Sequence, residues 1–176
     1  MKEFLTYATP ESAGLASSQI IDFLDHLELF GAYLHSFAII KGHSVIAEGY
    51  RPPFHAHELH RMYSVSKTYA AMAVGVLIGD GKIRLEDKFI SFFPEYADCD
   101  DPFLLDTTIE DLLKMNSPFD GVPTYCAHVP GNLEKHWLDT FFNTKTFHAP
   151  GTVWNYDTSA TYVLGVITER LVGMPF

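Results

Sequence analysis

The chain has 176 residues, 47% of them apolar, and a formal net charge of −10 at pH 7. This length is enough to bury a core, and this composition is that of a globular protein rather than a disordered one. The acidic balance argues against a nucleic-acid partner, which would require a basic face. The longest apolar run, residues 70–78, is too short to cross a membrane, which takes about 20 residues.

The N-terminal segment, residues 1–10, lacks the basic region and the apolar run of a secretory signal. We therefore expect a cytoplasmic protein with no membrane partner. The two cysteines, Cys99 and Cys126, are too few for a disulfide framework and do not have metal-site spacing.

The first third of the chain is predicted to form a helix and a β-hairpin. An apolar stripe at helical spacing predicts an amphipathic helix over residues 17–29, capped by Ser17 or Ser18. Segments 36–40 and 44–50 are rich in β-branched and aromatic residues, which predicts two strands joined by a turn. Two strands alone do not make a stable sheet, so we expect the sheet to need further strands.

The most informative segment is residues 64–78, SVSKTYAAMAVGVLI. It is predicted to be a helix that is apolar on every side beyond Thr68, and such a helix is expected at the centre of a domain. Its strongly polar groups, Ser64 and Lys67, lie in the first turn. Burying them there is unfavourable unless they are paired or used.

The remaining segments are predicted to be mainly helical. A capping box of Thr107 and Glu110 predicts a short helix over 107–114. We expect a loop over 118–130 and two further helices, over 132–142 and 157–172. We divide the chain into residues 1–62, holding the first helix and the hairpin, and residues 63–176, the mainly helical part.

Ser64 and Lys67 form an S-x-x-K tetrad. On a helix, residues three apart share a face, so the lysine amine is expected beside the serine hydroxyl. A serine alcohol needs an adjacent base to act as a nucleophile, and a desolvated lysine can be that base. The tetrad alone is a weak signal, since a capping serine and a surface lysine also match it, but its position at the start of an apolar helix strengthens it.

Four stretches, in order along the chain, resemble motifs of the serine β-lactamases, the penicillin-binding DD-peptidases and related esterases. Residues 63–68, YSVSKT, resemble the nucleophile motif of this family. GKIRLED at 81–87 with FPEY at 93–96 resembles G-K-L-x-L-D-D followed by L-P-E-F. TIEDLL at 108–113 with NS at 116–117 resembles T-I-R-H-L-L-x-H-T-S-G, and PGTVWNY at 150–156 with YVLG at 162–165 resembles P-G-x-x-F-x-Y-S-N-x-x-Y-x-L-L-G.

The resemblance implies an α+β fold of the β-lactamase/transpeptidase type, in which an antiparallel sheet with flanking helices is joined to a helical subdomain. It implies that Ser64 is acylated, that Lys67 activates it, and that Tyr156 helps to pass the proton to the leaving group. The substrate would be a small-molecule ester or amide, and no cofactor is implied.

The chain also departs from the family pattern. Thr158 stands where the family usually has Asn, two residues after the tyrosine, so Thr158 is predicted to contact substrate as a hydroxyl rather than as an amide. The third motif, K-T-G or H-x-G on a later strand, does not occur. By the resemblance the chain is truncated before the C-terminal strands and half of the oxyanion hole. An exposed sheet edge would favour self-association.

Two other functions stay open. One is a catalytically incomplete or non-catalytic binding module of the same fold. The other is a metal-dependent hydrolase, because His55, His57 and His60 are similar to the H-x-H-x-D-H signature of metallo-β-lactamase-like hydrolases. Leu59 occupies the aspartate position of that signature, and a zinc site needs three or four converging ligands, so we interpret these residues as a solvated loop.

Overall fold

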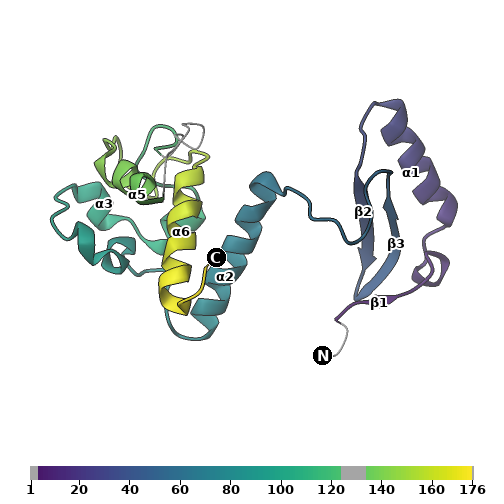
Figure 1. Cartoon of the computed structure of the whole chain (residues 1–176), viewed down its shortest axis with the longest axis horizontal. Coiled ribbons are helices and arrows are strands. Elements are labelled where there is room, and N and C mark those ends of the chain that lie inside the picture. Colours follow the sequence, from purple (N-terminus) through teal and green to yellow (C-terminus); the bar gives the residue numbers. More distant parts are fainter. Residues whose placement is uncertain (1–3, 124–133, 176) are drawn as a thin grey trace. The chain divides into compact units, whose positions relative to one another are not determined.

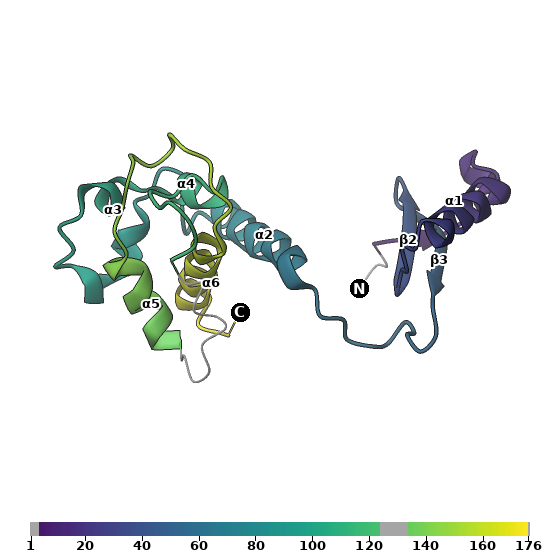
Figure 2. The same cartoon turned by 90° about the horizontal axis from the view of Figure 1, so that it is seen from above.

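The computed structural model describes residues 4–123 and 134–175 (Figures 1 and 2). The chain divides into two compact units, one that ends at Arg61 and one that begins at Met62. Cys126 and parts of the predicted loop over 118–130 and helix over 132–142 lie outside the described residues. In the described parts of the chain, no helix combines the length and the apolar character needed to cross a bilayer.

The first unit contains a three-stranded sheet in the order β1-β3-β2. The predicted hairpin is confirmed as β2 (Ser36–Lys41) and β3 (Ser44–Tyr50), which pair antiparallel. A short strand that was not predicted, β1 (Thr6–Tyr7), pairs parallel with β3. The sheet of the described residues is therefore mixed. Two residues are too few for an alternating pattern, which is why β1 leaves no signal in the sequence.

The predicted helix over 17–29 is confirmed as α1 (Ser17–Leu29), which lies against one face of the hairpin (Figures 1 and 2). The prediction that Ser17 or Ser18 caps it is wrong, because the N-cap position is Ala16. The Glu11 carboxylate, from the preceding turn, instead accepts the N–H of Ser17 at 2.8 Å. This carboxylate accepts a backbone N–H that has no partner within the helix, and its negative charge is stabilising near the positive N-terminal end of the helix dipole. The hydrogen bonds that Ser17 donates to it lower the pKa of Glu11.

The second unit is built from helices and short 3-10 turns. The helices α2 and α6 lie side by side (Figure 1). The helices of this unit are α2 (Ser66–Gly79), α3 (Pro102–Asp106), α4 (Ile109–Leu113), α5 (Glu134–Asn143) and α6 (Thr158–Val172). The 3-10 turns are Tyr63–Val65, Phe89–Phe92 and Pro94–Tyr96. The predicted helices over 132–142 and 157–172 correspond to α5 and α6, whereas α3, only five residues long, was not predicted.

An aromatic cluster and the buried face of α6 form the core of this unit. Phe89, Phe93, Phe119 and Phe141 are each at most 1% exposed. The rings of Phe89 and Phe141 meet edge to face with their centroids 5.7 Å apart, a favourable arrangement for aromatic pairs. The buried residues of α6 include Ala160, Val163, Leu164 and Ile167.

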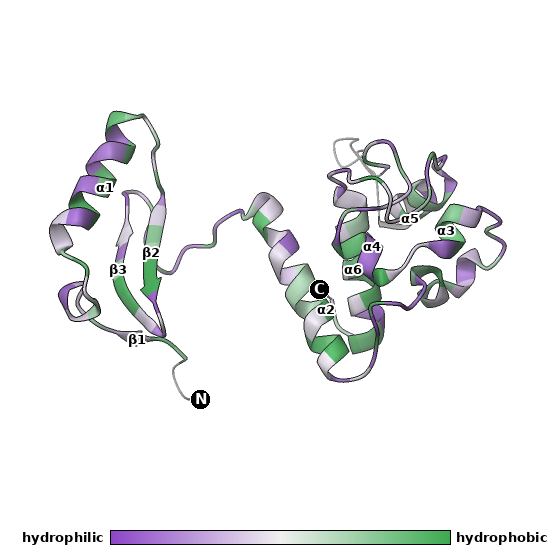
Figure 3. Cartoon of the chain, turned by 180° about the vertical axis from the view of Figure 1, so that it is seen from behind, coloured by the Kyte–Doolittle hydropathy of each residue, from purple (hydrophilic) through white to green (hydrophobic). Residues whose placement is uncertain are grey.

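The expectation that the helix over 64–78 is buried on every side is wrong for the described residues. Ala70, Val74 and Leu77 are buried against the rest of the unit, but Tyr69, Met72 and Val76 are 57%, 62% and 64% exposed. Apolar residues occupy almost every position of α2 beyond its first turn, so they form no single stripe. Figure 3 colours the helix by hydropathy. The apolar composition of α2 would favour burial on every side. Composition does not determine which segments pack against a helix, however, and α6 covers only one face of α2.

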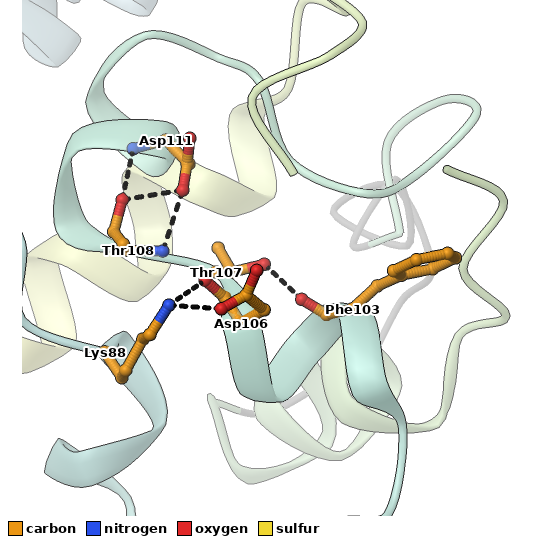
Figure 4. A network of polar contacts seen from close by, with 6 residues as sticks. All are labelled: Lys88, Phe103, Asp106, Thr107, Thr108 and Asp111. Carbon is orange, nitrogen blue, oxygen red and sulfur yellow. Dashed lines mark hydrogen bonds and ion pairs between the residues drawn. The ribbon is translucent and has the colours of Figure 1, made fainter. Parts of the chain in front are cut away.

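Hydrogen bonds close the connection from α3 to α4 (Figure 4). The Thr107 hydroxyl, which is buried, donates to the Phe103 carbonyl oxygen at 2.7 Å. The capping box therefore uses the next residues: the Asp111 N–H donates to Thr108 Oγ1 at 3.2 Å, and the Thr108 N–H donates to Asp111 Oδ2 at 2.9 Å. The predicted capping box of Thr107 and Glu110 is thus wrong by one residue, because Thr107 instead closes α3.

We expect Phe141→Ala to destabilise this unit by about 3–5 kcal/mol, because it empties a large buried volume and leaves a cavity. Phe147→Ala is the matched control, since Phe147 is 54% exposed and should cost far less. Urea unfolding followed by circular dichroism measures both values. Equal losses in the two variants would contradict the assignment of Phe141 to the core.

Candidate active site

Ser64 lies in the 3-10 turn Tyr63–Val65, immediately before α2. The helix thus begins at Ser66, two residues later than predicted. The turn nevertheless keeps the predicted geometry, because Lys67 Nζ donates a hydrogen bond to Ser64 Oγ at 3.3 Å. Tyr63 has a φ of 46°, a value that residues other than glycine rarely adopt and that concentrates at functional sites.

Tyr156 comes from the loop that leads into α6, 92 residues from Ser64 in the chain, and its hydroxyl donates to Ser64 Oγ at 2.7 Å. The Lys67 ammonium lies 5.0 Å from the centroid of the Tyr156 ring. The structure therefore brings together the three residues that the sequence singled out for acyl transfer, and all three belong to the second unit.

The environment of Tyr156 favours the phenolate. The hydrogen bond with Ser64 lowers the pKa of Tyr156 below its usual value of 10, and interaction with Lys67 lowers it further. The side chain of Tyr156 is 43% exposed, Ser64 is exposed and Lys67 is half-buried. Within this unit the site is therefore open to an approaching molecule.

The backbone on either side of Tyr156 is tied to residues 115–121, the segment that follows α4. The Asn155 N–H donates to the Met115 carbonyl oxygen at 3.0 Å, and Asn155 Nδ2 donates to the Gly121 carbonyl oxygen at 2.7 Å. Asp157 is fully buried and accepts from Ser117 Oγ at 2.8 Å and from the Ser159 N–H at 2.8 Å.

The anchoring roles of Asn155, Asp157 and Ser117 were not predicted from the sequence. Asp157 directly precedes a helix and has the residue type of an N-cap, which is a signal that the sequence does contain. The pairing of Asp157 with Ser117 leaves no such signal, because the two residues are 40 positions apart and neither belongs to a periodic pattern.

A hollow of about 400 Å³ lies beside Lys67, between α2 and α6. Thr158, predicted to contact substrate, is the first residue of α6 and lines this hollow. The other residues that line it are Tyr63, Ser66, Lys67, Ala70, Thr161, Tyr162, Gly165, Val166 and Glu169. The hollow therefore places hydroxyl groups and apolar side chains next to Lys67.

The histidine-rich loop belongs to the first unit. His55 Nε2 lies 3.3 Å from Glu58 Oε1, and His60 Nε2 lies 3.2 Å from His35 Nδ1. His35 also stacks on Phe54 with ring centroids 3.9 Å apart. Across residues 4–123 and 134–175, no three His, Cys, Asp or Glu side chains are grouped so as to hold a metal ion. The imidazoles of His55 and His60 thus contact protein groups within this unit.

The fold is of the β-lactamase/transpeptidase type. A family model described as Beta-lactamase matches residues 24–176. The chain therefore belongs to the β-lactamase family, as its sequence motifs indicated.

A curated relative, the 6-aminohexanoate-dimer hydrolase of Paenarthrobacter ureafaciens, is 27% identical over 152 residues, which is 80% of this chain and 39% of that protein. A solved Bacillus anthracis structure with a provisional assignment as a 6-aminohexanoate-dimer hydrolase matches with a TM-score of 0.67 and 18% identity, over 85% of this chain and 43% of that one. The D-amino acid amidase of Ochrobactrum anthropi SV3 matches with a TM-score of 0.55 and 22% identity, over 70% and 40% of the two chains.

These comparisons support the β-lactamase/transpeptidase-like fold, and the curated relative is a hydrolase by name. At these sequence identities the similarity to the solved structures establishes the fold and nothing about function. The chain spans less than half the length of each of the three relatives.

We expect the Tyr156 phenol to titrate below its usual pKa of about 10 and to move back toward that value in Lys67→Met, because this variant removes the positive charge that favours the phenolate. The measurement is a pH titration of the chain labelled with ¹³C in the tyrosine ring, in which Tyr156→Phe identifies the signal. Lys145→Met is the matched control, since Lys145 contacts Phe147 instead. A Tyr156 signal that titrates identically in the wild type, Lys67→Met and Lys145→Met would contradict the described contact.

Proposed function

We propose that the chain carries the nucleophilic centre of a serine hydrolase, which cleaves a small ester or amide through an acyl-enzyme on Ser64. The observation that carries this proposal is the approach of two groups to Ser64 Oγ, Lys67 Nζ at 3.3 Å and the Tyr156 hydroxyl at 2.7 Å. A serine alcohol is a weak nucleophile until an adjacent group takes its proton. The Tyr156 hydroxyl lies within the reach of about 2.6–3.2 Å that proton transfer requires, and the Lys67 contact is slightly longer, as catalytic contacts often are before substrate binds.

In the proposed acylation step, the amine of Lys67, once it has given up its own proton, takes the proton of Ser64 while Oγ bonds to the carbonyl carbon of the substrate. Tyr156 passes a proton to the leaving alcohol or amine as the scissile bond breaks. The lowered pKa of Tyr156 supports this role, because acid–base catalysis is most efficient when the pKa of the group approaches the working pH. Water, directed by Tyr156 and Lys67, then hydrolyses the acyl-enzyme and regenerates the Ser64 hydroxyl.

We place part of the substrate in the hollow beside Lys67, where Thr158 would donate a hydrogen bond from its hydroxyl. Hydrolysis is supported by the name of the curated relative, the 6-aminohexanoate-dimer hydrolase. Because Thr158 is a hydroxyl where the family usually has an amide, we expect weaker recognition of β-lactams than of simple esters.

A non-catalytic binding module of the same fold is the second candidate. It is favoured by the extent of the match, since this chain spans only 39% of the length of the curated relative. The two candidates differ in one outcome, because a binding module leaves Ser64 unmodified by reagents that acylate or phosphonylate active serines.

The test is intact-mass spectrometry after exposure to a fluorophosphonate and, separately, to a penicillin. We expect one fluorophosphonate adduct on the wild-type chain and none on Ser64→Ala. Lys67→Met should slow adduct formation by about 10²-fold or more, the usual contribution of a general base.

Ser91→Ala is the control, because Ser91 is an exposed serine of the same unit whose hydroxyl donates to the Lys88 carbonyl oxygen. It should be labelled at the wild-type rate. Labelling that persists in Ser64→Ala, or a wild-type chain that stays unlabelled, would overturn the proposal for this chain. A penicillin adduct on Ser64 would show that β-lactams are recognised despite Thr158.

A further inference from the structure

Tyr156 depends on its backbone for its position. Its ring is 43% exposed, so few neighbouring side chains surround it. The contacts described for its side chain are with Ser64 and Lys67, the two groups on which it would act. A tyrosine hydroxyl lies at the far end of its side chain, so a small rotation of the backbone displaces it by a distance comparable with an ångström. A misplacement of about 1 Å can cost about 10²-fold in rate.

Asp157, the next residue, anchors this backbone on one side, as Asn155 does on the other. Its carboxylate joins two parts of the unit: one oxygen accepts from the Ser117 hydroxyl, and the other accepts from the Ser159 N–H in the first turn of α6. Both contacts are 2.8 Å long, and Asp157, Ser117 and Ser159 are all fully buried. Breaking them would leave buried polar groups unpaired, which costs more than the loss of an exposed hydrogen bond.

We propose that Asp157 is the positioning residue for Tyr156, and that its contacts with Ser117 and α6 hold the Tyr156 hydroxyl against Ser64. This inference rests on the proposed function, since it matters to the reaction only if Tyr156 takes part in acyl transfer. Ser117 is the residue through which the segment after α4 contacts Asp157. A carboxylate at position 157 thus links the segment after α4 to the proton-transfer group of the site.

The alternative is that Asp157 merely caps α6 and stabilises the fold. The chain offers a matched control for this alternative in Asp101, the N-cap of α3. Its carboxylate accepts from the N–H groups of Phe103 and Leu104, and its other oxygen accepts from the Thr146 hydroxyl at 2.7 Å. Asp101→Ala therefore removes a helix cap and a hydroxyl contact at Thr146, ten residues before Tyr156, but none of the contacts described for Asn155, Tyr156 or Asp157.

The first readout is the rate of fluorophosphonate labelling of Ser64 in a double-mutant cycle. We expect Asp157→Ala and Tyr156→Phe each to slow labelling by about 10²-fold, and the double variant to be no slower than either. Asp157→Asn should keep most of the rate, because asparagine caps helices well and can still bond to Ser117. Asp101→Ala should stay within about twofold of the wild type, since sites without shared partners do not couple.

The second readout does not need activity. In the ¹³C-tyrosine titration, Asp157→Ala and the milder Ser117→Ala should both move the Tyr156 pKa back toward about 10, whereas Asp101→Ala should leave it unchanged. Ser117→Ala also serves if Asp157→Ala does not fold. The chain has nine tyrosines, so Tyr156→Phe is needed to identify the signal.

Losses that multiply in the double variant, together with an unchanged Tyr156 titration in Asp157→Ala and Ser117→Ala, would overturn the positioning role. A wild-type chain that is not labelled at Ser64 overturns the proposed function instead. In that case the titration alone decides whether Asp157 holds Tyr156 in place.

Discussion

Ser64 Oγ is the point at which two separate segments of the second unit meet. Lys67 approaches it from the first turn of α2, and Tyr156 approaches it from the loop before α6. The Ser64 hydroxyl accepts a hydrogen bond from each of the other two polar groups, so none of the three is left without a partner. The packing of α2 on α6 brings Tyr156 close to Ser64. Residues 115–121 hold the loop before α6 in place through hydrogen bonds with Asn155 and Asp157. Disturbing any one of these contacts changes the geometry around one hydroxyl.

The parts of this arrangement that could be predicted from the sequence are local or carry a motif. Ser64 and Lys67 are three residues apart, so helical geometry alone relates them. Tyr156 is distant in the chain, and only the resemblance of its surrounding motif to a known family connected it with Ser64. The strand pair around Gly42 and the last helix with Gly173 at its end follow from turn and cap signals.

The parts that could not be predicted depend on which segments meet. The pairing of Ser117 with Asp157 crosses 40 residues, and neither residue type demands the other. The exposure of Tyr69, Met72 and Val76 on α2 is of the same kind, because an apolar surface shows what would favour burial and not what covers it. The errors in capping are smaller in scale. Both Thr107 and Thr108 suit an N-cap, and the choice between them was made by the hydroxyl contact that closes α3.

Under the proposed function, the position of Thr158 bears on specificity more than on the acyl transfer itself. A hydroxyl lines the hollow beside Lys67, where the family usually has an amide that both donates and accepts hydrogen bonds. One donor fewer reduces discrimination between carbonyl compounds. In this proposal, the Ser64–Lys67 pair and the substrate contact at Thr158 are therefore separable features.

The most direct test of this account is to trap the covalent intermediate with an ester that reports its own cleavage. The chain is mixed with excess p-nitrophenyl acetate, quenched in acid within seconds and digested, and the acetylated peptide is identified by tandem mass spectrometry. The account predicts a burst of p-nitrophenol and an acetyl group on the Ser64 hydroxyl. Acetylation confined to Lys67 or to other surface amines, with no burst, would contradict it.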